Sequence, residues 1–297
     1  MKIDDIQAFL AVVRLQSLSV AAESLQLTQS AVTRRLQSLE ESLGAILLDR
    51  HTKPMKPTAI GLRVYERCQG VMREVDSLHE LVAEDAAPSG NLRLGVPQTV
   101  GDAVLLDALQ ALKQRFVDLH VQVAHGWGGQ LVQRIQHREL DAAAALFPAG
   151  KVFPDGVVGH SLARMPLLVV GAKGLDFGKR CKLADCQGEG WVLNPDGCGF
   201  RAGLSHALAE QGLSLKLNLE TFGTDLQLGL AASGMGLGLV PAPLLQHSRH
   251  REQLQVLQVA DFKPMVDLWL VHAAFVGNLQ GAIRLFGESV AYGMNTD

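Results

Sequence analysis

The chain has 297 residues, of which 47% are hydrophobic and 19% are charged. This length predicts two or three compact units, and the composition excludes a disordered chain. The formal net charge of -3 and the isoelectric point near 6.4 exclude a global attraction to nucleic acid or anionic membranes, so any such binding must come from a local patch.

The N-terminal sequence MKIDDIQAF is acidic where a secretory signal would be basic, and no apolar run reaches the roughly 18 residues that a membrane helix needs. The cysteines at positions 68, 181, 186 and 198 are irregularly spaced and too few for a disulfide scaffold. We therefore expect a cytoplasmic protein that does not associate with membranes.

The first 45 residues contain three short segments with apolar residues at helical spacing. The first covers residues 4–15, Ser19 is expected to cap the second, and Thr28 is expected to cap the third. A helix, a short helix, a tight turn and a longer helix in this order are typical of the helix-turn-helix, whose last helix enters the major groove of DNA.

The face of the third helix opposite its apolar residues carries hydroxyls, amides and a guanidinium. Glutamine can bond adenine in bidentate fashion, arginine can bond guanine or a phosphate, and threonine can offer its hydroxyl to either. An ordinary solvated helix face remains the alternative. The candidate DNA contacts on this helix are Thr28, Gln29, Ser30, Thr33, Arg34 and Gln37.

A basic segment follows, with Arg50, His51, Lys53 and Lys56 around two prolines. Prolines stiffen such a hairpin and remove backbone donors, so it can lie beside a phosphate backbone without recruiting another strand. Arg50, Lys53 and Lys56 are therefore candidate contacts to DNA.

Residues 3–63 resemble the LysR-type transcriptional regulators. The resemblance implies a winged helix-turn-helix, and departures such as Leu18, Leu48, Gln16 and Pro57 concern only packing and the path of the wing. The segments that carry it are Phe9, SLSVAAESL (17–25), TQSAVTR (28–34), Leu39-Glu40, Leu43-Gly44, Leu48-Asp49-Arg50 and TAIG (58–61).

A long helix is expected from its cap at Thr58 to about residue 84. Its apolar residues alternate gaps of four and three, which is the seam of a coiled coil. Such a seam needs a partner, and the family resemblance implies a homodimer or a homotetramer built on paired linker helices. The seam consists of Val64, Cys68, Val71, Val75, Leu78 and Val82.

Residues 85–91 are small, polar and proline-containing, which indicates a hinge. After them, short apolar strands alternate with helices. This alternation predicts an open parallel sheet with helices on both faces. The fold class expected for the whole chain is therefore α+β with α/β. The expected domains are a DNA-binding domain (1–57), a linker helix (58–88) and an effector-binding domain (89–297), within which the family resemblance implies lobe I at 89–161 and 267–297 and lobe II at 162–266. The resemblance extends to this region, where LAASGMGLGLVP (230–241) matches the family and implies a periplasmic-binding-protein-like, two-lobed domain.

Ligands of such sheets bind where strands lead into helices. The family resemblance places a small-molecule effector at these turns, where Arg201 would clamp a carboxylate and aromatic side chains would supply apolar walls. Lobe core is the alternative for the aromatic residues, and a surface charge is the alternative for Arg201. The candidate effector contacts are Gln98, Thr99, Val100, Trp127, Gly128, Phe147, Pro148, Phe200, Arg201 and Thr224.

Other chemistries are less well supported. The glycines at 234, 236 and 238 lead into a strand rather than a helix, which argues against a dinucleotide site, and the cysteines lack zinc-site spacing. We find no catalytic grouping, so we expect no enzyme activity, no metal and no cofactor.

The sequence thus predicts an oligomeric, sequence-specific DNA-binding transcriptional regulator controlled by a small molecule. The alternatives are a regulator that senses oxidants through Cys198 near a helix start, and a two-lobed solute-binding protein, which would have no use for the basic wing.

Overall fold

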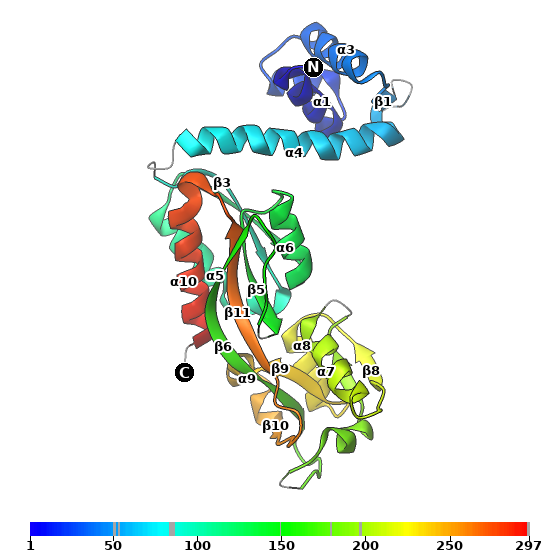
Figure 1. Ribbon diagram of the computed structural model, residues 1–297, viewed down its shortest axis with the longest axis vertical. Helices are drawn as coiled ribbons and strands as arrows, with labels where there is room; N and C mark the ends of the chain where they lie inside the picture. Colours follow the sequence, from blue (N-terminus) through cyan, green and yellow to red (C-terminus); the bar gives the residue numbers. More distant parts are fainter. Residues whose placement is uncertain are drawn as a thin grey trace. The chain divides into compact units, whose positions relative to one another are not determined.

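The computed structural model describes residues 1–49, 52, 54–82, 87–148, 150–178, 180–195 and 198–295 (Figure 1). The chain divides into two compact units, Met1–Glu84 and Asp85–Asp297. Within the described residues, no helix combines the length and the hydrophobicity that a membrane crossing requires.

The first unit has the helix-turn-helix order and a two-stranded wing. Its second helix is capped by Ser17 rather than by Ser19, because the Ser17 hydroxyl accepts a hydrogen bond from the Val20 N–H at 3.4 Å. The third helix begins after Thr28 as expected. The elements are α1 (Ile3–Leu15), α2 (Leu18–Ser24), α3 (Gln29–Leu43), β1 (Leu48–Asp49), β2 (Lys56–Pro57) and α4 (Ala59–Val82).

The core of this unit forms where α1, α3 and α4 meet. Phe9, Val32 and Leu39 are fully buried, and the ring of Tyr65 on α4 meets the Phe9 ring edge to face. Cys68 on α4 is buried against the same core. Helix α4 therefore completes the hydrophobic core of the first unit.

The expected coiled-coil seam of α4 is divided by this packing. Val64 and Cys68 contact the core of their own unit, whereas Val71 and Leu78 remain exposed, Leu78 by 66%. A heptad pattern cannot distinguish a partner chain from the chain's own core, because both bury the same face. Only the C-terminal part of the seam is available to a partner.

The second unit alternates strands and helices. Its elements are β3 (Gly90–Val96), α5 (Gln98–Arg115), β4 (Leu119–His125), α6 (Gly128–Gln136), β5 (Ala142–Pro148), β6 (Val157–Ala172), η1 (Leu183–Gln187), β7 (Trp191–Leu193), α7 (Gly199–Ala209), β8 (Leu217–Glu220), α8 (Thr224–Ala232), β9 (Gly238–Pro241), α9 (Ala242–Gln246), η2 (Arg251–Gln253), β10 (Leu254–Leu257), β11 (Met265–Ala273), η3 (Gly277–Leu279) and α10 (Gln280–Asn295).

The main sheet has the strand order β10-β6-β11-β5-β3-β4, with β9 also paired to β6. Strands β3, β4 and β5 are parallel, but β11 is antiparallel to both β5 and β6. The prediction of an open parallel sheet was therefore wrong where β11 pairs with β5 and β6. Strand β11 runs opposite to its neighbours because the chain returns through it from the far part of the unit.

Strand β6 belongs to two parts of the unit. Its residues up to Pro166 pair with β11, and its residues from Leu167 onward pair with β9 and β10 (Figure 1). Strands β7 and β8 form a separate parallel pair beside the second part. The first half of β6, strand β10 and helix α9 were not expected from the sequence.

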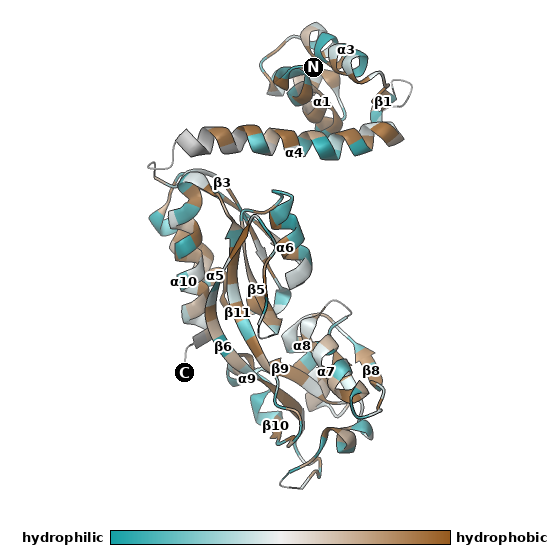
Figure 2. Ribbon diagram, viewed as in Figure 1, coloured by the Kyte–Doolittle hydropathy of each residue, from teal (hydrophilic) through white to brown (hydrophobic). Residues whose placement is uncertain are grey.

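The core of the first part lies under the parallel strands. Strand β5 opens with the four alanines Ala142–Ala145, all fully buried, and Figure 2 shows hydrophobic residues along the neighbouring strands. Small side chains on the central strand let α6 pack closely against the sheet, and Phe147 and Pro148 are the last two residues of the strand.

Candidate nucleic-acid interface and ligand cleft

Thr28 is the N-cap of α3. Its hydroxyl accepts a hydrogen bond from the Ala31 N–H at 3.2 Å and lies 3.1 Å from the Ser30 hydroxyl. Such a cap satisfies a free N–H group and fixes the first turn of the helix. The residues of that turn are held in one orientation before any ligand arrives.

The structure gathers the outward residues of α3 on one surface. Gln29, Ser30, Thr33, Arg34 and Gln37 together line a shallow, open hollow. The Thr33 hydroxyl donates to the Gln29 carbonyl at 2.9 Å, so its proton is already used within the helix. Thr33 therefore offers a ligand only its acceptor lone pairs.

The two arginines of α3 differ in their surroundings. Arg35 forms an ion pair with Asp4 of α1 at 3.0 Å. Arg34 is exposed and has no ion pair within the described residues. The guanidinium of Arg34 is thus available for a base or a phosphate, whereas that of Arg35 holds two helices together.

The wing is a short antiparallel ladder between β1 and β2. Lys56 is exposed on β2, and its backbone N–H donates to the Thr52 hydroxyl at 3.2 Å. Arg50 and Lys53, which the sequence also suggested as DNA contacts, lie outside the described residues, as does His51.

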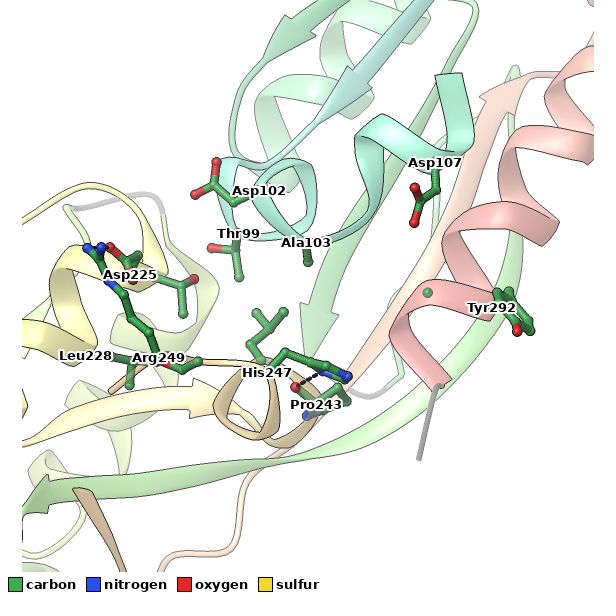
Figure 3. Close-up of a pocket in the computed structure, with 14 residues that line it drawn as sticks. Thr99, Asp102, Ala103, Asp107, Asp225, Leu228, Pro243, His247, Arg249 and Tyr292 are labelled. Atoms are coloured by element: carbon green, nitrogen blue, oxygen red, sulfur yellow. Dashed lines mark hydrogen bonds and ion pairs between the residues drawn. The ribbon is translucent and has the colours of Figure 1, made fainter. Parts of the chain in front are cut away.

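In the second unit, a cleft of about 520 Å³ lies between α5 and α10 on one side and α8 and α9 on the other (Figure 3). This volume is in the range of small-molecule sites. The residues that line the cleft are Thr99, Asp102, Ala103, Asp107, Thr224, Asp225, Leu228, Pro243, Leu244, His247, Ser248, Arg249, Tyr292 and Gly293.

Two of the sequence-predicted effector contacts, Thr99 and Thr224, meet in this cleft. They come from the first turns of α5 and α8, and only 5% and 8% of their surfaces are exposed. Neither hydroxyl has a hydrogen-bond partner among the residues that the structure describes. Gln98 lies close by, with its amide nitrogen 3.0 Å from where a Cβ on Gly223 would be.

The other candidates lie elsewhere in the unit. Phe147 is buried, packs edge to face on Phe153, and covers Gly128 so closely that a Cβ there would lie 2.7 Å from its ring. Pro148 lies against Gly199 at the start of α7. The aromatic wall suggested at Phe147 is therefore part of the hydrophobic core.

Four further candidates do not line the cleft either. Val100 is fully buried and Phe200 packs against the core. Trp127 is half-buried at the start of α6, where its backbone N–H donates to the Gln130 side chain at 3.2 Å. Arg201 is paired with Glu220 at 2.5 Å, so the carboxylate clamp expected from the sequence is already occupied by a residue of the same chain.

Charged residues that the sequence analysis missed give the cleft its electrostatic character. Asp225 accepts a hydrogen bond from Arg249 at 2.6 Å and lies 3.5 Å from the imidazole of His250. Burial raises the pKa of Asp102, the nearby Asp225 raises it further, and His125 lowers it. Asp102 and Asp225 follow the predicted contacts Thr99 and Thr224 closely in the chain, and that position was the available signal.

Two polar side chains at strand ends are buried without partners. The Asn194 carbonyl oxygen follows β7 and the Thr221 hydroxyl follows β8, and neither has a hydrogen bond among the described residues. Buried polar groups are rarely left in this state. Both residues directly follow the carboxyl ends of their strands, and α8 begins shortly after Thr221.

The cysteines of this unit are buried, and Cys198 is only 6% exposed. Burial raises the pKa of the Cys198 thiol more than the N–H groups of Phe200 and Arg201 lower it. A reactive, oxidant-sensing cysteine needs the opposite, a thiolate that is accessible at neutral pH. Within the described residues, no group of three or more histidine, cysteine or acidic side chains is placed to hold a metal ion.

Comparisons with known proteins agree with both units. Residues 3–62 match the bacterial regulatory helix-turn-helix protein family of the lysR type, and residues 85–287 match the LysR substrate binding domain. A solute-binding protein would not carry the first of these domains.

Curated relatives and solved structures extend along nearly the whole chain. The transcriptional regulator GltR of Bacillus subtilis (strain 168) is 28% identical over 263 residues, covering 88% of this chain and 86% of its own length. The regulator CzcR of Bacillus anthracis is 26% identical over 247 residues, with coverages of 83% and 82%.

Two full-length structures share the fold. An OxyR variant from Pseudomonas aeruginosa has a TM-score of 0.69 at 18% identity and 98% coverage of both chains. The regulator CbnR, solved in complex with its target DNA, has a TM-score of 0.62 at 20% identity, covering 99% of this chain and 100% of its own. The chain belongs to the LysR family, and it is a DNA-binding transcriptional regulator with an effector-binding domain.

Proposed function

We propose that α3 reads base edges in the major groove of an operator and that the cleft of the second unit binds the effector that controls this binding. Gln29, Ser30 and Arg34 would meet base edges or phosphates, and Lys56 with Arg50 and Lys53 of the wing would meet the neighbouring backbone. The exposed side chains along α3 support the first assignment, because Arg34, which has no ion pair among the described residues, and Gln29 are of the types that bond guanine and adenine in the major groove.

The observation that carries the effector site is the pair of largely buried residues Thr99 and Thr224, whose unpartnered hydroxyls line the cleft. They belong to helices that flank the cleft from opposite sides, so a ligand bonded to both would fix the spacing of α5 and α8. We assign α5 and α10 to lobe I and α8 and α9 to lobe II of a periplasmic-binding-protein-like domain. Ligand binding would then change lobe closure.

We further propose a homodimer, or a homotetramer of two such dimers, joined through α4. The exposed Val71 and Leu78 support this arrangement, since exposed apolar residues at heptad spacing are stabilised by a partner helix. Two heads on one dimer would read a two-fold operator. Effector binding would act on the DNA by changing the relative placement of the two heads, and the two affinities must then be coupled reciprocally.

The experiment that tests this function combines thermal shift with gel shift. Purified protein is screened against a metabolite library, and a compound that binds the native state raises the melting temperature. Each hit is then tested for its effect on binding to upstream DNA, in the wild type and in Thr99→Val, which removes the hydroxyl but keeps the shape. The proposal is wrong if hits bind equally well to both proteins and leave the DNA affinity unchanged.

A further inference from the structure

We infer that the effector of this cleft is a small organic cation carrying amine groups, an inference that rests on the cleft being the effector site proposed above. The cleft is lined by three carboxylates, those of Asp102, Asp107 and Asp225, and by one arginine (Figure 3). The arginine, Arg249, is already bonded to Asp225 at 2.6 Å. Asp102 and Asp107 have no ion pair among the residues that the structure describes.

A second observation points to a bound ligand. The residues Thr99 and Thr224 are more than nine-tenths buried, line the same cleft, and have hydroxyls that lack hydrogen-bond partners within the described chain. A hydroxyl oxygen that no protein donor reaches can accept a hydrogen bond from a ligand. An ammonium group carries three donors and no acceptor, so it suits both the hydroxyl oxygens and the carboxylates.

The cleft is unsuited to an anion, although two helices begin beside it. The positive end of a helix dipole favours negative charge. At the N-terminus of α8, Asp225 already lies in the first turn. The Asp102 carboxylate is also close to this end of the helix, with its Oδ2 3.6 Å from where a Cβ on Gly223 would be. A ligand carboxylate would therefore meet two carboxylates of the protein.

The geometry also favours more than one amine. Asp102 and Asp107 both lie on α5, and five residues of helix correspond to a rise of ~7.5 Å along its axis. The two side chains lie toward different ends of the cleft (Figure 3). Leu228, Pro243 and Leu244 supply apolar surface for a short hydrocarbon chain between the charges.

The protonation of Asp102 agrees with this assignment. Burial raises the pKa of its carboxyl, Asp225 raises it as well, and His125 on β4 only partly opposes them. The ionised form of Asp102 is therefore less favoured than that of a free aspartate side chain. A cation bound beside it would favour the ionised form.

The test uses full-length protein and three probes with the same four-carbon chain: butane-1,4-diamine, butane-1,4-diol and succinate. Binding is measured by calorimetry at fixed ionic strength. The wild type should bind the diamine, and Asp102→Asn should raise its dissociation constant roughly tenfold or more through the loss of a charge-assisted contact. Asp118→Asn, an exposed aspartate between α5 and β4 outside the cleft, is the matched control and should bind as the wild type does.

Asp102→Asn also separates a loss of binding from a loss of folding. Because ionised Asp102 is disfavoured by its surroundings, the neutral amide should leave the melting temperature of the ligand-free protein unchanged or raise it. If the diamine binds but Asp102→Asn does not weaken it, the carboxylate is not its ligand and the inference fails.

The other outcomes separate this inference from the function on which it rests. If succinate or the diol binds instead, and Thr99→Val abolishes that binding, the cleft remains the effector site and only the amine class is wrong. If no probe binds, the amine class is also rejected. Whether the cleft is the effector site is then decided by comparing the wild type and Thr99→Val in the metabolite library screen.

Discussion

Arg164 and Asp267 form a two-point ion pair across β6 and β11. The guanidinium donates at 2.6 and 2.9 Å to the two carboxylate oxygens of Asp267, which is 2% exposed. The two residues are paired in the antiparallel ladder just before β6 enters the second part of the unit. The hydrogen bonds from Arg164 lower the pKa of Asp267.

Replacing Arg164 by methionine should therefore destabilise the second unit. The change leaves a buried carboxylate without its donors, and we expect the free energy of unfolding to fall, by an amount that the exposure of Arg164 limits. Urea denaturation measures it. Arg284→Met, which breaks an exposed pair with Glu288 on α10, is the control and should change the stability by less than about 0.5 kcal/mol.

The same pair gives a pH dependence with a definite sign. Because the folded pKa of Asp267 is lowered, its contribution to stability is complete above the unfolded pKa of about 3.9 and is lost as the pH falls through the folded value. Arg164→Met should lose less stability than the wild type on acidification below pH ~4. Equal losses in both proteins would show that the pair does not set the charge state of Asp267.

Gly61 is held against the wing by close backbone packing. A Cβ at this position would lie 2.0 Å from the Leu47 carbonyl oxygen, which also accepts the Thr58 N–H. Gly61→Ala should therefore cost about 1–3 kcal/mol in the first unit, although alanine favours helices. Thermal unfolding checks this.

A helical glycine with free space around it provides the comparison for Gly61. Gly129 in α6 has no atom within 4 Å of a Cβ position, so Gly129→Ala should be neutral or stabilising by up to about 1 kcal/mol. A stable Gly61→Ala protein with unchanged operator affinity would mean that the wing can shift without consequence.

Arg34 and Arg35 provide a matched pair for the DNA interface. Arg34→Ala should weaken operator binding by about 1–3 kcal/mol if the guanidinium bonds a base, with a loss of discrimination at one operator position. Arg35→Ala should mainly reduce thermal stability, because Arg35 is paired with Asp4. Gel shifts on the operator and on single-base variants separate the two effects. Equal losses of affinity for both variants would refute the assignment.

Cys198 should be unreactive in the folded protein. Its thiol is buried and its pKa is raised, so alkylation by iodoacetamide at neutral pH should be slow in the native state and fast after denaturation. Peroxide should alter operator binding equally in the wild type and in Cys198→Ser. An effect of peroxide that disappears only in Cys198→Ser would restore the oxidant-sensing alternative.

Local sequence determined the helix-turn-helix of the first unit, but not the packing of α4 against it. Caps such as Thr28 and the apolar spacing of α1 and α3 depend on residues within four positions of each other, so they can be read directly from the chain. The same reasoning misplaced the cap of α2 by two residues, because both Ser17 and Ser19 are suitable and their relative backbone conformation decides.

The cleft of the second unit depended on the tertiary structure. The sequence identified the turns that begin α5 and α8, and with them Thr99 and Thr224. It could not show that Arg201 pairs with Glu220, that Phe147 belongs to the core, or that Arg249 lies beside Asp225, since each partner is distant in the chain. The direction of β11 was undetermined for the same reason: strand spacing fixes which residues face the core, but not which strand lies alongside or in which direction it runs. The helix-turn-helix order thus followed from local patterns and the family from a resemblance in sequence, while the charge of the cleft was decided by contacts between residues that only the fold brings together.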